Sequence, residues 1–463
     1  MPNSAVRGKL ETAVLKQMIA DEHLETVLTV FPDIYGRLMG KRVSGRYFLE
    51  HVLEGSLHAC DYLLACDMEM DPVPGYAFTS WAQGYGDFRL VPDFNTLRIA
   101  SWLDKSGIVL CDVCDEDTGA LVQIAPRSIL RQQVERATQS GCVAMGASEL
   151  ELYVFKDTYE EAAQKKYQDL EPLGKYIEDY HILQGTKEEF VIGAIRYHLE
   201  RSGVPVEFSK GEWGPGQQEI NLRYTDFLEM ADRHVLYKHA AKEIAMQQKC
   251  SVTFMAKWDE RYAGSGMHVH ASLWDSTGTK PLFPGEESLG ALKSSILFRH
   301  FLGGWIKHLR ELFVFYAPYP TSYKRFRAGS FAPTGIAWST DNRTSGFRIV
   351  GHGPSLRIEC RAPGADANPY LAFAATLAAG MDGIENKIEP PPMFRGDVYN
   401  ALDLPQVPHS LPEAIREFEN SAFVRKTFGA ALVEHYLHFF HTEQRKFEEA
   451  VTTWERARYF ERA

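Results

Sequence analysis

The chain has 463 residues, of which 45% are hydrophobic and 24% charged, and its formal net charge is -11. This composition is typical of a folded globular protein with roughly two to four domains. The negative charge argues against nucleic acid as a partner, although a local cluster of arginines can still bind a small phosphorylated ligand.

Targeting signals and cysteine pairs are not evident in the sequence. The N-terminal residues MPNSAVRGKLETAV lack the apolar run of a signal peptide, and the most apolar stretch, residues 369–381, is too short to cross a bilayer. The cysteines are scattered, and the CxxC of Cys111 and Cys114 has no second ligand pair to complete a zinc site. We therefore expect a cytoplasmic protein with no membrane partner.

Short apolar runs between Gly, Pro and Asp turns occupy the first hundred residues. Residues 27–43 predict a hairpin that turns near Pro32 to Gly36. Residues 75–93, rich in glycine and aromatic residues, predict a long loop that is either functional or disordered. The pattern changes near residue 101, so we divide the chain into an N-terminal domain, 1–108, and a second domain, 109–463.

From that boundary onward, strands alternate with long helical segments. Apolar periodicity predicts helices over residues 125–141, 187–203 and 226–248. Residues 287–316 predict one long helix or two shorter ones, and residues 369–381 predict a buried, alanine-rich helix.

Four of the predicted strands carry chemically reactive side chains on one face, because alternate residues of a strand point to the same side. These side chains are Glu149 and Glu151 in SELELYVF, Glu219, Asn221 and Arg223 in QQEINLRY, His268, His270 and Ser272 in GMHVHASLW, and Arg357, Glu359 and Arg361 in LRIECRAP. Taken alone, each strand is more simply explained by a solvent-exposed outer face. Together they favour a functional sheet, since Glu, His and Arg bind divalent metals and phosphates.

A sheet built from these strands would gather carboxylates that repel each other unless a cation lies between them. Glu212, in the turn GEWGPGQQE, can join them. The candidate metal ligands are Glu149, Glu151, Glu212, Glu219, His268 and Glu359. Carboxylates with one imidazole suit Mg²⁺ or Mn²⁺, and the set divides into two sites of three.

Arginines cluster in the C-terminal third of the chain, at Arg325, Arg343, Arg348, Arg357 and Arg361. Carboxylate-bound metals facing several arginines are typical of phosphoryl transfer, in which both neutralise the transferring group. The sequence contains no P-loop, kinase signature or dinucleotide fingerprint.

In its ordered motifs the sequence resembles the glutamine synthetase family. Its signatures occur in order as SELELYVF, GEWGPGQQEI, GSGMHVHASL, SYKRFRAG, DNRTSGFRI and LRIECRAPGADANPYLAFAA. The resemblance implies an α+β protein with a small β-grasp-like N-terminal domain and a large catalytic domain, whose curved antiparallel sheet is flanked by helices. It also implies a homo-oligomer, a double-ring dodecamer with active sites shared between neighbours.

The resemblance also assigns roles by position. Glu151, Glu212 and Glu219 would hold one metal beside glutamate, and Glu149, His268 and Glu359 another beside ATP, with two to three ions of Mg²⁺ or Mn²⁺ per active site. Expected nucleotide contacts are His270, Ser272, Arg348, Arg357 and Tyr224. Expected catalytic and substrate contacts are Arg343, Arg325, Arg361, Gly264 and Glu151. In this family ATP phosphorylates the γ-carboxylate of glutamate, and an amine then attacks the acyl phosphate.

Two departures from the family concern the amine. Glutamine synthetases of this type carry a glutamate in a Gly-x-Glu-x-Pro flap and an aspartate before Gly-Ser-Ser. Here the flap reads GSFAP, with Phe331 in that place, and the other loop reads YAFTSWAQG, with Ala77 or Phe78 near the aspartate position. An ammonium ion would lose its hydration there at high cost, and a cation–π contact returns only about 0.5–2 kcal/mol.

We therefore predict an ATP-dependent γ-glutamyl-amine ligase rather than a true glutamine synthetase. Its amine would be apolar, aromatic or small with a neutral tail, and Phe331 and Trp81 would line its pocket. Two alternatives stay open: a true glutamine synthetase whose ammonium ligands come from Tyr85 or Asp87, and a non-catalytic structural or regulatory oligomer. Leu402 replaces the tyrosine that the family adenylylates, which predicts that this control is absent.

Overall fold

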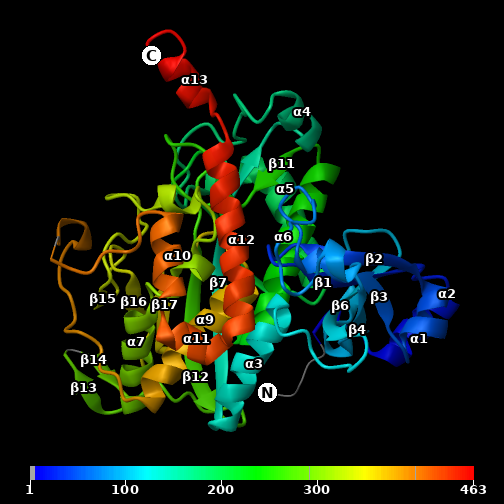
Figure 1. Cartoon of the computed structure of the whole chain (residues 1–463), viewed down its shortest axis with the longest axis horizontal. Coiled ribbons are helices and arrows are strands. Elements are labelled where there is room, and N and C mark those ends of the chain that lie inside the picture. Colours follow the sequence, from blue (N-terminus) through cyan, green and yellow to red (C-terminus); the bar gives the residue numbers. More distant parts are fainter. Residues whose placement is uncertain (1–5, 291, 402) are drawn as a thin grey trace.

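The computed structural model describes residues 6–290, 292–401 and 403–463, so Leu402 and the prediction about adenylylation lie outside the described residues. The chain forms a smaller and a larger sheet (Figure 1). The smaller sheet has the strand order β2-β1-β6-β4-β3, with β5 against β6, and is accompanied by two helices. Its elements are α1 (Thr12–Ala20), β1 (Thr26–Pro32), β2 (Leu38–Ser44), α2 (Gly45–Tyr47), β3 (Leu57–Cys60), β4 (Asp87–Pro92), β5 (Arg98–Ile99) and β6 (Ser106–Asp115).

The strand pairing confirms one prediction for this region and corrects another. The predicted hairpin is present, with Thr26 of β1 opposite Ser44 of β2. Residues 75–93 are not a single loop, because residues 81–83 form a short 3₁₀-helix and β4 begins at Asp87. The alternating residues of DFRLVP bury Phe88 and Leu90 in the smaller sheet, and this alternation was hidden by the glycines that precede it.

The position of the domain boundary also needs correction. β6 pairs in parallel with β1 through residues 106–110 and antiparallel with β4 through residues 111–115. A boundary between residues 108 and 109 falls within β6, the strand that joins the two halves of the smaller sheet. The division into two domains itself stays a prediction.

The larger sheet has nine strands in the order β15-β16-β17-β12-β7-β9-β8, with β10 and β11 paired to β7. Its described pairs are antiparallel, except that β15 and β16 are parallel. The four strands predicted to share a sheet are the neighbours β17, β12, β7 and β9, which confirms that expectation. The strands are β7 (Cys142–Phe155), β8 (Val206–Gly211), β9 (Gln217–Leu222), β10 (Thr225–Asp226), β11 (Ser251–Thr253), β12 (Met267–Asp275), β15 (Trp338–Thr340), β16 (Phe347–Val350) and β17 (Arg357–Cys360).

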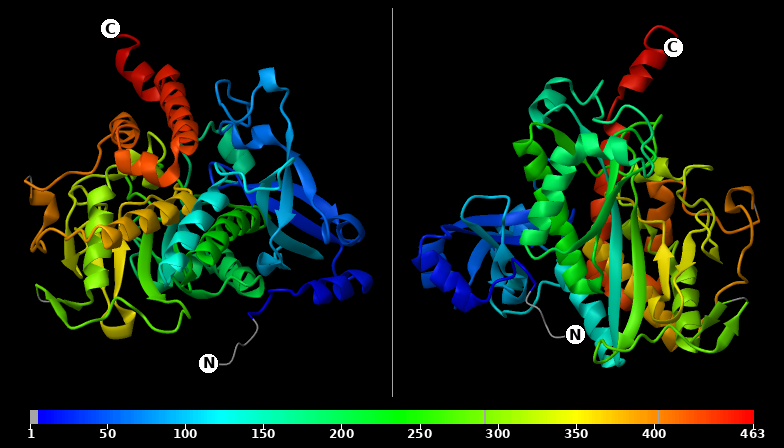
Figure 2. Two further views of the ribbon diagram at one scale, coloured as in Figure 1. Left: turned by 60° about the horizontal axis from the view of Figure 1, so that its bottom comes forward. Right: turned by 180° about the vertical axis from the view of Figure 1, so that it is seen from behind.

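Helices cover the larger sheet and extend beyond it (Figures 1 and 2). They are α3 (Pro126–Gln139), α4 (Tyr159–Gln164), α5 (Ile182–Arg201), α6 (Phe227–Gln247), α7 (Ile296–His308), α8 (Phe313–Tyr316), α9 (Pro369–Glu385), α10 (Leu411–Glu419), α11 (Ala422–Phe428), α12 (Ala430–Glu449) and α13 (Thr453–Tyr459). The helices predicted over 125–141, 187–203, 226–248 and 369–381 are present. None of the described helices combines the length and apolar character that a bilayer crossing requires.

The helix predicted to begin at residue 287 is wrong at its start. Residues Glu287–Leu289 and Leu292–Ser294 form a small hairpin, β13 and β14. The hydroxyl of Ser295 accepts a hydrogen bond from the Phe298 N–H, so the helix is capped there and begins at Ile296. Its glycines let it approach α9 closely, since a Cβ at Gly304 would lie 2.3 Å from the Ala379 carbonyl oxygen.

A buried arginine joins the smaller sheet to the helices under the larger one. Arg127, at the start of α3, is 2% exposed. Its guanidinium donates to both carboxylate oxygens of Asp232 on α6, at 3.1 and 2.9 Å, and to Asp93 and Asp112 of the smaller sheet, at 2.8 and 2.5 Å. The Tyr370 hydroxyl of α9 donates to the same Asp232, at 2.6 Å. One cation thus compensates three carboxylates from different layers.

We predict that Arg127→Met lowers the stability by about 3–5 kcal/mol, because Asp232 would stay buried without its cation. Arg131→Met is the matched control: Arg131 contacts Asp93 and Asp112 but is 25% exposed, and its loss should cost about 1 kcal/mol or less. Calorimetric melting of both variants checks this. Equal shifts in the melting temperature would contradict a special role for Arg127.

Candidate active site

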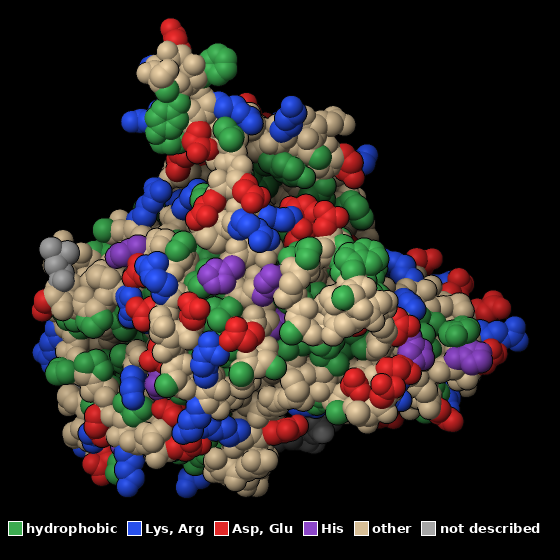
Figure 3. Space-filling view, viewed as in Figure 1, with side chains coloured by type: hydrophobic (Ala, Val, Ile, Leu, Met, Phe, Trp, Pro, Cys, Tyr) green, Lys and Arg blue, Asp and Glu red, His purple; other side chains and the backbone are tan. Residues whose placement is uncertain are grey.

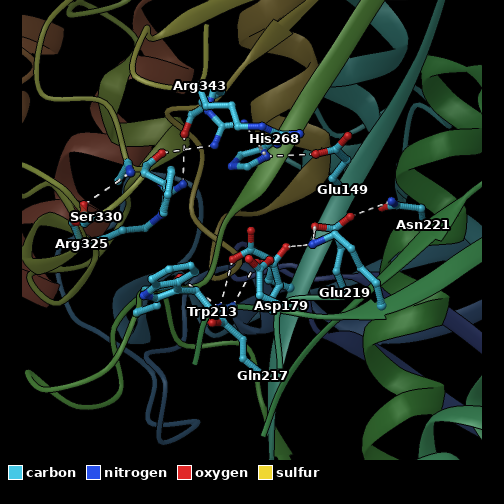
Figure 4. A pocket seen from close by; sticks show the side chains of 18 of the residues that line it. Glu149, Asp179, Trp213, Gln217, Glu219, Asn221, His268, Arg325, Ser330 and Arg343 are labelled. Carbon is cyan, nitrogen blue, oxygen red and sulfur yellow. Dashed lines mark hydrogen bonds and ion pairs between the residues drawn. The ribbon is translucent and has the colours of Figure 1, made fainter. Parts of the chain in front are cut away.

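The register of the larger sheet places the predicted side chains next to each other. Glu149 of β7 is opposite His268 of β12, and Glu151 is opposite Glu219 of β9. Glu359 of β17 is opposite His270. Residues opposite each other project from the same face, so the alternation in each strand becomes one polar face of the sheet. This face borders a cavity of about 330 Å³ (Figure 4).

Three carboxylates converge at one end of this face. Glu151, Glu212 and Glu219 each place an oxygen within 4.8 Å of the others. Burial, and then the charge of Glu212, raise the pKa of Glu151 to about 7, and burial with Glu149 raises the pKa of Glu219 well above its usual value. The Lys210 ammonium contacts Glu212 and lies 3.4 Å from Glu219. Burial and mutual repulsion disfavour the ionised forms of Glu151 and Glu219, and a divalent cation between the carboxylates would relieve that repulsion.

A second cluster contains two histidines where the resemblance implied one. Oxygens of Glu149 and Glu359 lie within 4.8 Å of a His270 nitrogen. The Nδ1 of His268, the predicted ligand, is 3.1 Å from Glu149 and 3.5 Å from Glu359. His270 Nδ1 accepts a hydrogen bond from Arg357 Nε at 3.2 Å, and its Nε2 contacts Glu149 at 2.8 Å, so both of its nitrogens already have protein partners.

The charge state of His268 also suits metal binding. Burial and the nearby Arg361 lower the pKa of His268 to about 4, which keeps the imidazole neutral as a metal ligand must be. Burial alone would raise the pKa of Glu149, but His270 and His268 hold that pKa well below its usual value. The two histidines thus favour the ionised form of the Glu149 carboxylate.

The predicted arginines surround these carboxylates. Glu359, which is 0% exposed, accepts from Arg361 at 2.5 Å and from Arg348 at 3.0 Å. Arg325 donates to the carbonyls of Ala362 and Arg361, both at 3.0 Å, which fixes its guanidinium. Arg343 lies in the loop between β15 and β16 and borders the cavity opposite Glu219 (Figure 4).

Gly264 lines the cavity, and the space around it explains why this position is a glycine. A Cβ at this position would lie 2.6 Å from the Ala256 carbonyl oxygen and 2.7 Å from Cγ of Arg325. Gln217 Nε2 donates to the Gly264 carbonyl and to Glu151, both at 3.1 Å. The sequence reasoning missed Gln217, although it belongs to the quoted GEWGPGQQE motif.

A second pocket, of about 490 Å³, adjoins the first at Glu149, Phe208 and Asn221. The predicted nucleotide contacts Tyr224, His270, Ser272 and Arg357 all line it. Arg348 lines the first cavity instead. The structure thus brings these residues together on the side of the Glu149 cluster.

The flap of the first cavity is aromatic. Phe331 lines the cavity, and its ring centroid is 5.8 Å from that of Trp213. Its φ of 60° is in the left-handed region, and its carbonyl accepts from Arg361 at 3.3 Å. Trp81, the other residue predicted for the amine pocket, is 77% exposed and packs on Tyr85 instead of lining this cavity. A single chain therefore does not bring Trp81 and Phe331 together.

The cavity also contains residues that the sequence reasoning did not single out, namely Asp179, Tyr180, Lys210, Trp213, Gln217 and Ser330. Lys210 and Trp213 flank Glu212 in the sequence, so nearness to a predicted ligand was an available signal. Asp179 precedes the predicted helix by several residues and carried no such signal.

Comparison with known proteins agrees with this geometry. Residues 123–459 match the family model described as the glutamine synthetase catalytic domain. The chain is 45% identical to a γ-glutamylethanolamide synthetase of Streptomyces coelicolor, over 97% of this chain and 95% of that one. It is 35% identical to a glutamate–isopropylamine ligase of a Pseudomonas species, over 98% and 99% of the two chains.

A solved structure, the ADP complex of GmaS, superposes with a TM-score of 0.83 and 28% identity, covering 96% of this chain and 99% of that one. The family model matches most of the chain, and the two relatives align with nearly all of it, in agreement with the motifs that the sequence carries in order. This chain belongs to the glutamine synthetase family.

Proposed function

We propose that this protein is an ATP-dependent ligase that joins the γ-carboxylate of glutamate to a small amine other than ammonia. The observation that carries the proposal is the flap, where Phe331 packs near Trp213 at the position of the family's ammonium-binding glutamate. The names of two relatives describe products or substrates of this kind, a γ-glutamylethanolamide and isopropylamine.

The two pockets divide the substrates. We assign ATP to the pocket of Tyr224, His270, Ser272 and Arg357, and glutamate to the cavity wall of Gly264 and Arg325. Glu151, Glu212 and Glu219 would hold one Mg²⁺ or Mn²⁺, and Glu149, His268 and Glu359 another. When bound, such ions neutralise phosphate oxygens and orient them for in-line transfer.

The residues of the chain support a two-step reaction. An oxygen of the γ-carboxylate attacks the terminal phosphorus of ATP, and the bond from that phosphorus to ADP breaks. Arg343 and Arg361 lie where they can neutralise the transferring group. The protonated amine first gives one proton to water, and the lone pair of its neutral nitrogen then attacks the γ-carbonyl carbon. The bond from that carbon to the phosphate oxygen breaks, and the second proton of the nitrogen goes to the departing phosphate.

The alternatives have less support in this geometry. In the described chain, Tyr85 and Asp87 do not line the cavity, so they supply no rearranged ammonium ligands within one subunit. A structural oligomer without activity would have no need to keep two ligand clusters and a ring of fixed arginines.

Assembly and compartment are also proposals. Trp81 is exposed in the segment between β3 and β4. We propose a double-ring dodecamer in which Trp81 of one subunit completes the cavity of its neighbour. The seven cysteines are free, which suits a reducing cytoplasm. The face in Figure 3 mixes acidic and basic side chains instead of presenting one sign.

We predict that Glu219→Gln lowers kcat at least about 100-fold and weakens Mg²⁺ binding, because the change removes a ligand charge but keeps its shape. Calorimetric titration with Mg²⁺ and initial rates of ADP release check this. Glu116→Gln, at an exposed turn outside the site, is the control and should leave both unchanged. Near-normal activity of Glu219→Gln would remove the proposed metal site.

We predict that Phe331→Glu raises the ratio of kcat/KM for ammonium to kcat/KM for isopropylamine by about 10-fold or more, since an anion returns to the flap and an apolar wall is lost. Phe331→Ala opens the pocket without adding charge and should change the ratio less. Steady-state rates with both amines measure it. If both variants lower all amines equally, Phe331 only shapes the flap.

We predict that the protein sediments as a ring-shaped assembly of about ten or more subunits, as the family resemblance implies. We also predict that Trp81→Ala lowers kcat/KM for the amine while the assembly stays intact. Analytical ultracentrifugation and rate measurements test the two parts. An active monomer at micromolar concentration would contradict the shared site.

A further inference from the structure

One carboxylate of the cavity has not been assigned a role. Asp179 lies in the segment before α5 and lines the cavity together with Trp213 and Phe331. Figure 4 shows it beside Trp213, on the side where Glu219 lies. The sequence comparison had suggested that no anion serves the amine, because the flap glutamate and the loop aspartate of the family are both replaced.

Asp179 differs from the other carboxylates of the cavity in having no partner. Glu149 contacts two histidines, Glu151 accepts from Gln217 and from the Gly266 N–H, and Lys210 contacts Glu212 and Glu219. Among the residues that the structure describes, no side chain or backbone group forms a hydrogen bond or ion pair with the Asp179 carboxylate. Asp179 is exposed to solvent where it borders the cavity, so its carboxylate is available to a cationic substrate.

The backbone holds Asp179 in an unusual conformation. Asp179 has a φ of 28° and Tyr180 a φ of 71°, and such left-handed backbone costs roughly 1–3 kcal/mol for a residue such as tyrosine. Two hydrogen bonds maintain it, from Asp179 N to the Glu212 carbonyl at 3.1 Å and from Tyr180 N to the Gly211 carbonyl at 3.3 Å. The segment is thereby fixed to the turn that carries the Glu212 carboxylate.

The residue directly before Asp179 is buried and hydrogen-bonded. Glu178 is 2% exposed and accepts from Gln218 Nε2 at 2.6 Å, and the same amide donates to Glu188 of α5 at 2.9 Å. Gly211 leaves room for it, since a Cβ there would lie 2.5 Å from Cβ of Glu178. With Glu178 fixed in the interior, Asp179 is left at the cavity.

We propose that Asp179 is the anionic partner that binds the protonated head of the amine substrate, an inference that rests on the proposed function. The ammonium group of the amine would meet this carboxylate, and its short tail would lie against the rings of Trp213 and Phe331. One free carboxylate in a cavity that two aromatic rings also line favours short primary monoamines, because the second charge of a diamine would lie unpaired against those rings.

The test uses two nucleophiles that differ in charge. Ethanolamine is protonated at neutral pH, whereas hydroxylamine is largely uncharged and needs no anionic partner. Asp179→Asn keeps the size and the tolerance for left-handed backbone but removes the charge. We expect it to raise KM for ethanolamine by about 10–100-fold and to change KM for hydroxylamine less than about 3-fold. Asp179→Glu should recover part of the loss, and Asp117→Asn, in an exposed turn, is the matched control.

The outcomes separate this inference from the proposed function. If wild-type protein releases no ADP with any of the amines tested, the proposed function is wrong, and the amine site is wrong with it. Two results with active wild-type protein would overturn the role of Asp179 alone. In the first, Asp179→Asn keeps the wild-type KM for ethanolamine. In the second, it raises KM for ethanolamine and hydroxylamine equally while melting at the wild-type temperature. A loss confined to ethanolamine supports it.

Discussion

Repulsion among carboxylates on one face of a buried sheet is the constraint on which the rest of this site depends. The strand register sets Glu151 against Glu219 and brings Glu149 near Glu359, so negative charges accumulate where water is scarce. Each cluster therefore has cations around it, Lys210 on one side and Arg348 and Arg361 on the other. The same repulsion that would destabilise an isolated sheet is the physical reason for the divalent metals that we propose between these carboxylates.

The opposite faces of the same strands keep this arrangement rigid. Leu150, Leu152 and Val154 alternate with the functional residues of β7 and are 0% exposed. Their burial fixes the register, because a slip by one residue would turn the glutamates into the core and the leucines into the cavity. The buried network around Arg127 then holds the smaller sheet against α3, α6 and α9. Packing far from the chemistry thus determines where the carboxylates lie.

The two halves of the proposed site, one that we assign to phosphate and one to the amine, differ in the kind of backbone that builds them. The phosphate half stands on regular antiparallel strands, whose geometry follows from pairing and leaves little freedom to vary. The amine half is built from segments with left-handed backbone at Phe331, Asp179 and Tyr180, held by hydrogen bonds to Arg361 and to the turn at Glu212. A family can keep the first half and change the second, because loop residues are replaced with less disturbance to the core than strand residues.

The sequence by itself determined the polar and apolar faces of the strands, the extents of most long helices and the carboxylates that gather on the polar face, because alternation, caps and motifs are local properties of the chain. It misplaced the start of α7, where the β13–β14 hairpin precedes the helix, and it put a domain boundary at residue 108 inside β6, because pairing between strands outweighs local pattern at both places. Only the tertiary structure decided that His270 joins His268 beside Glu149, that Asp179 borders the cavity, and that Trp81 does not reach it within one chain. These facts depend on which segments fold against each other, and contacts between residues far apart in the chain leave no periodic signal in the residues that make them.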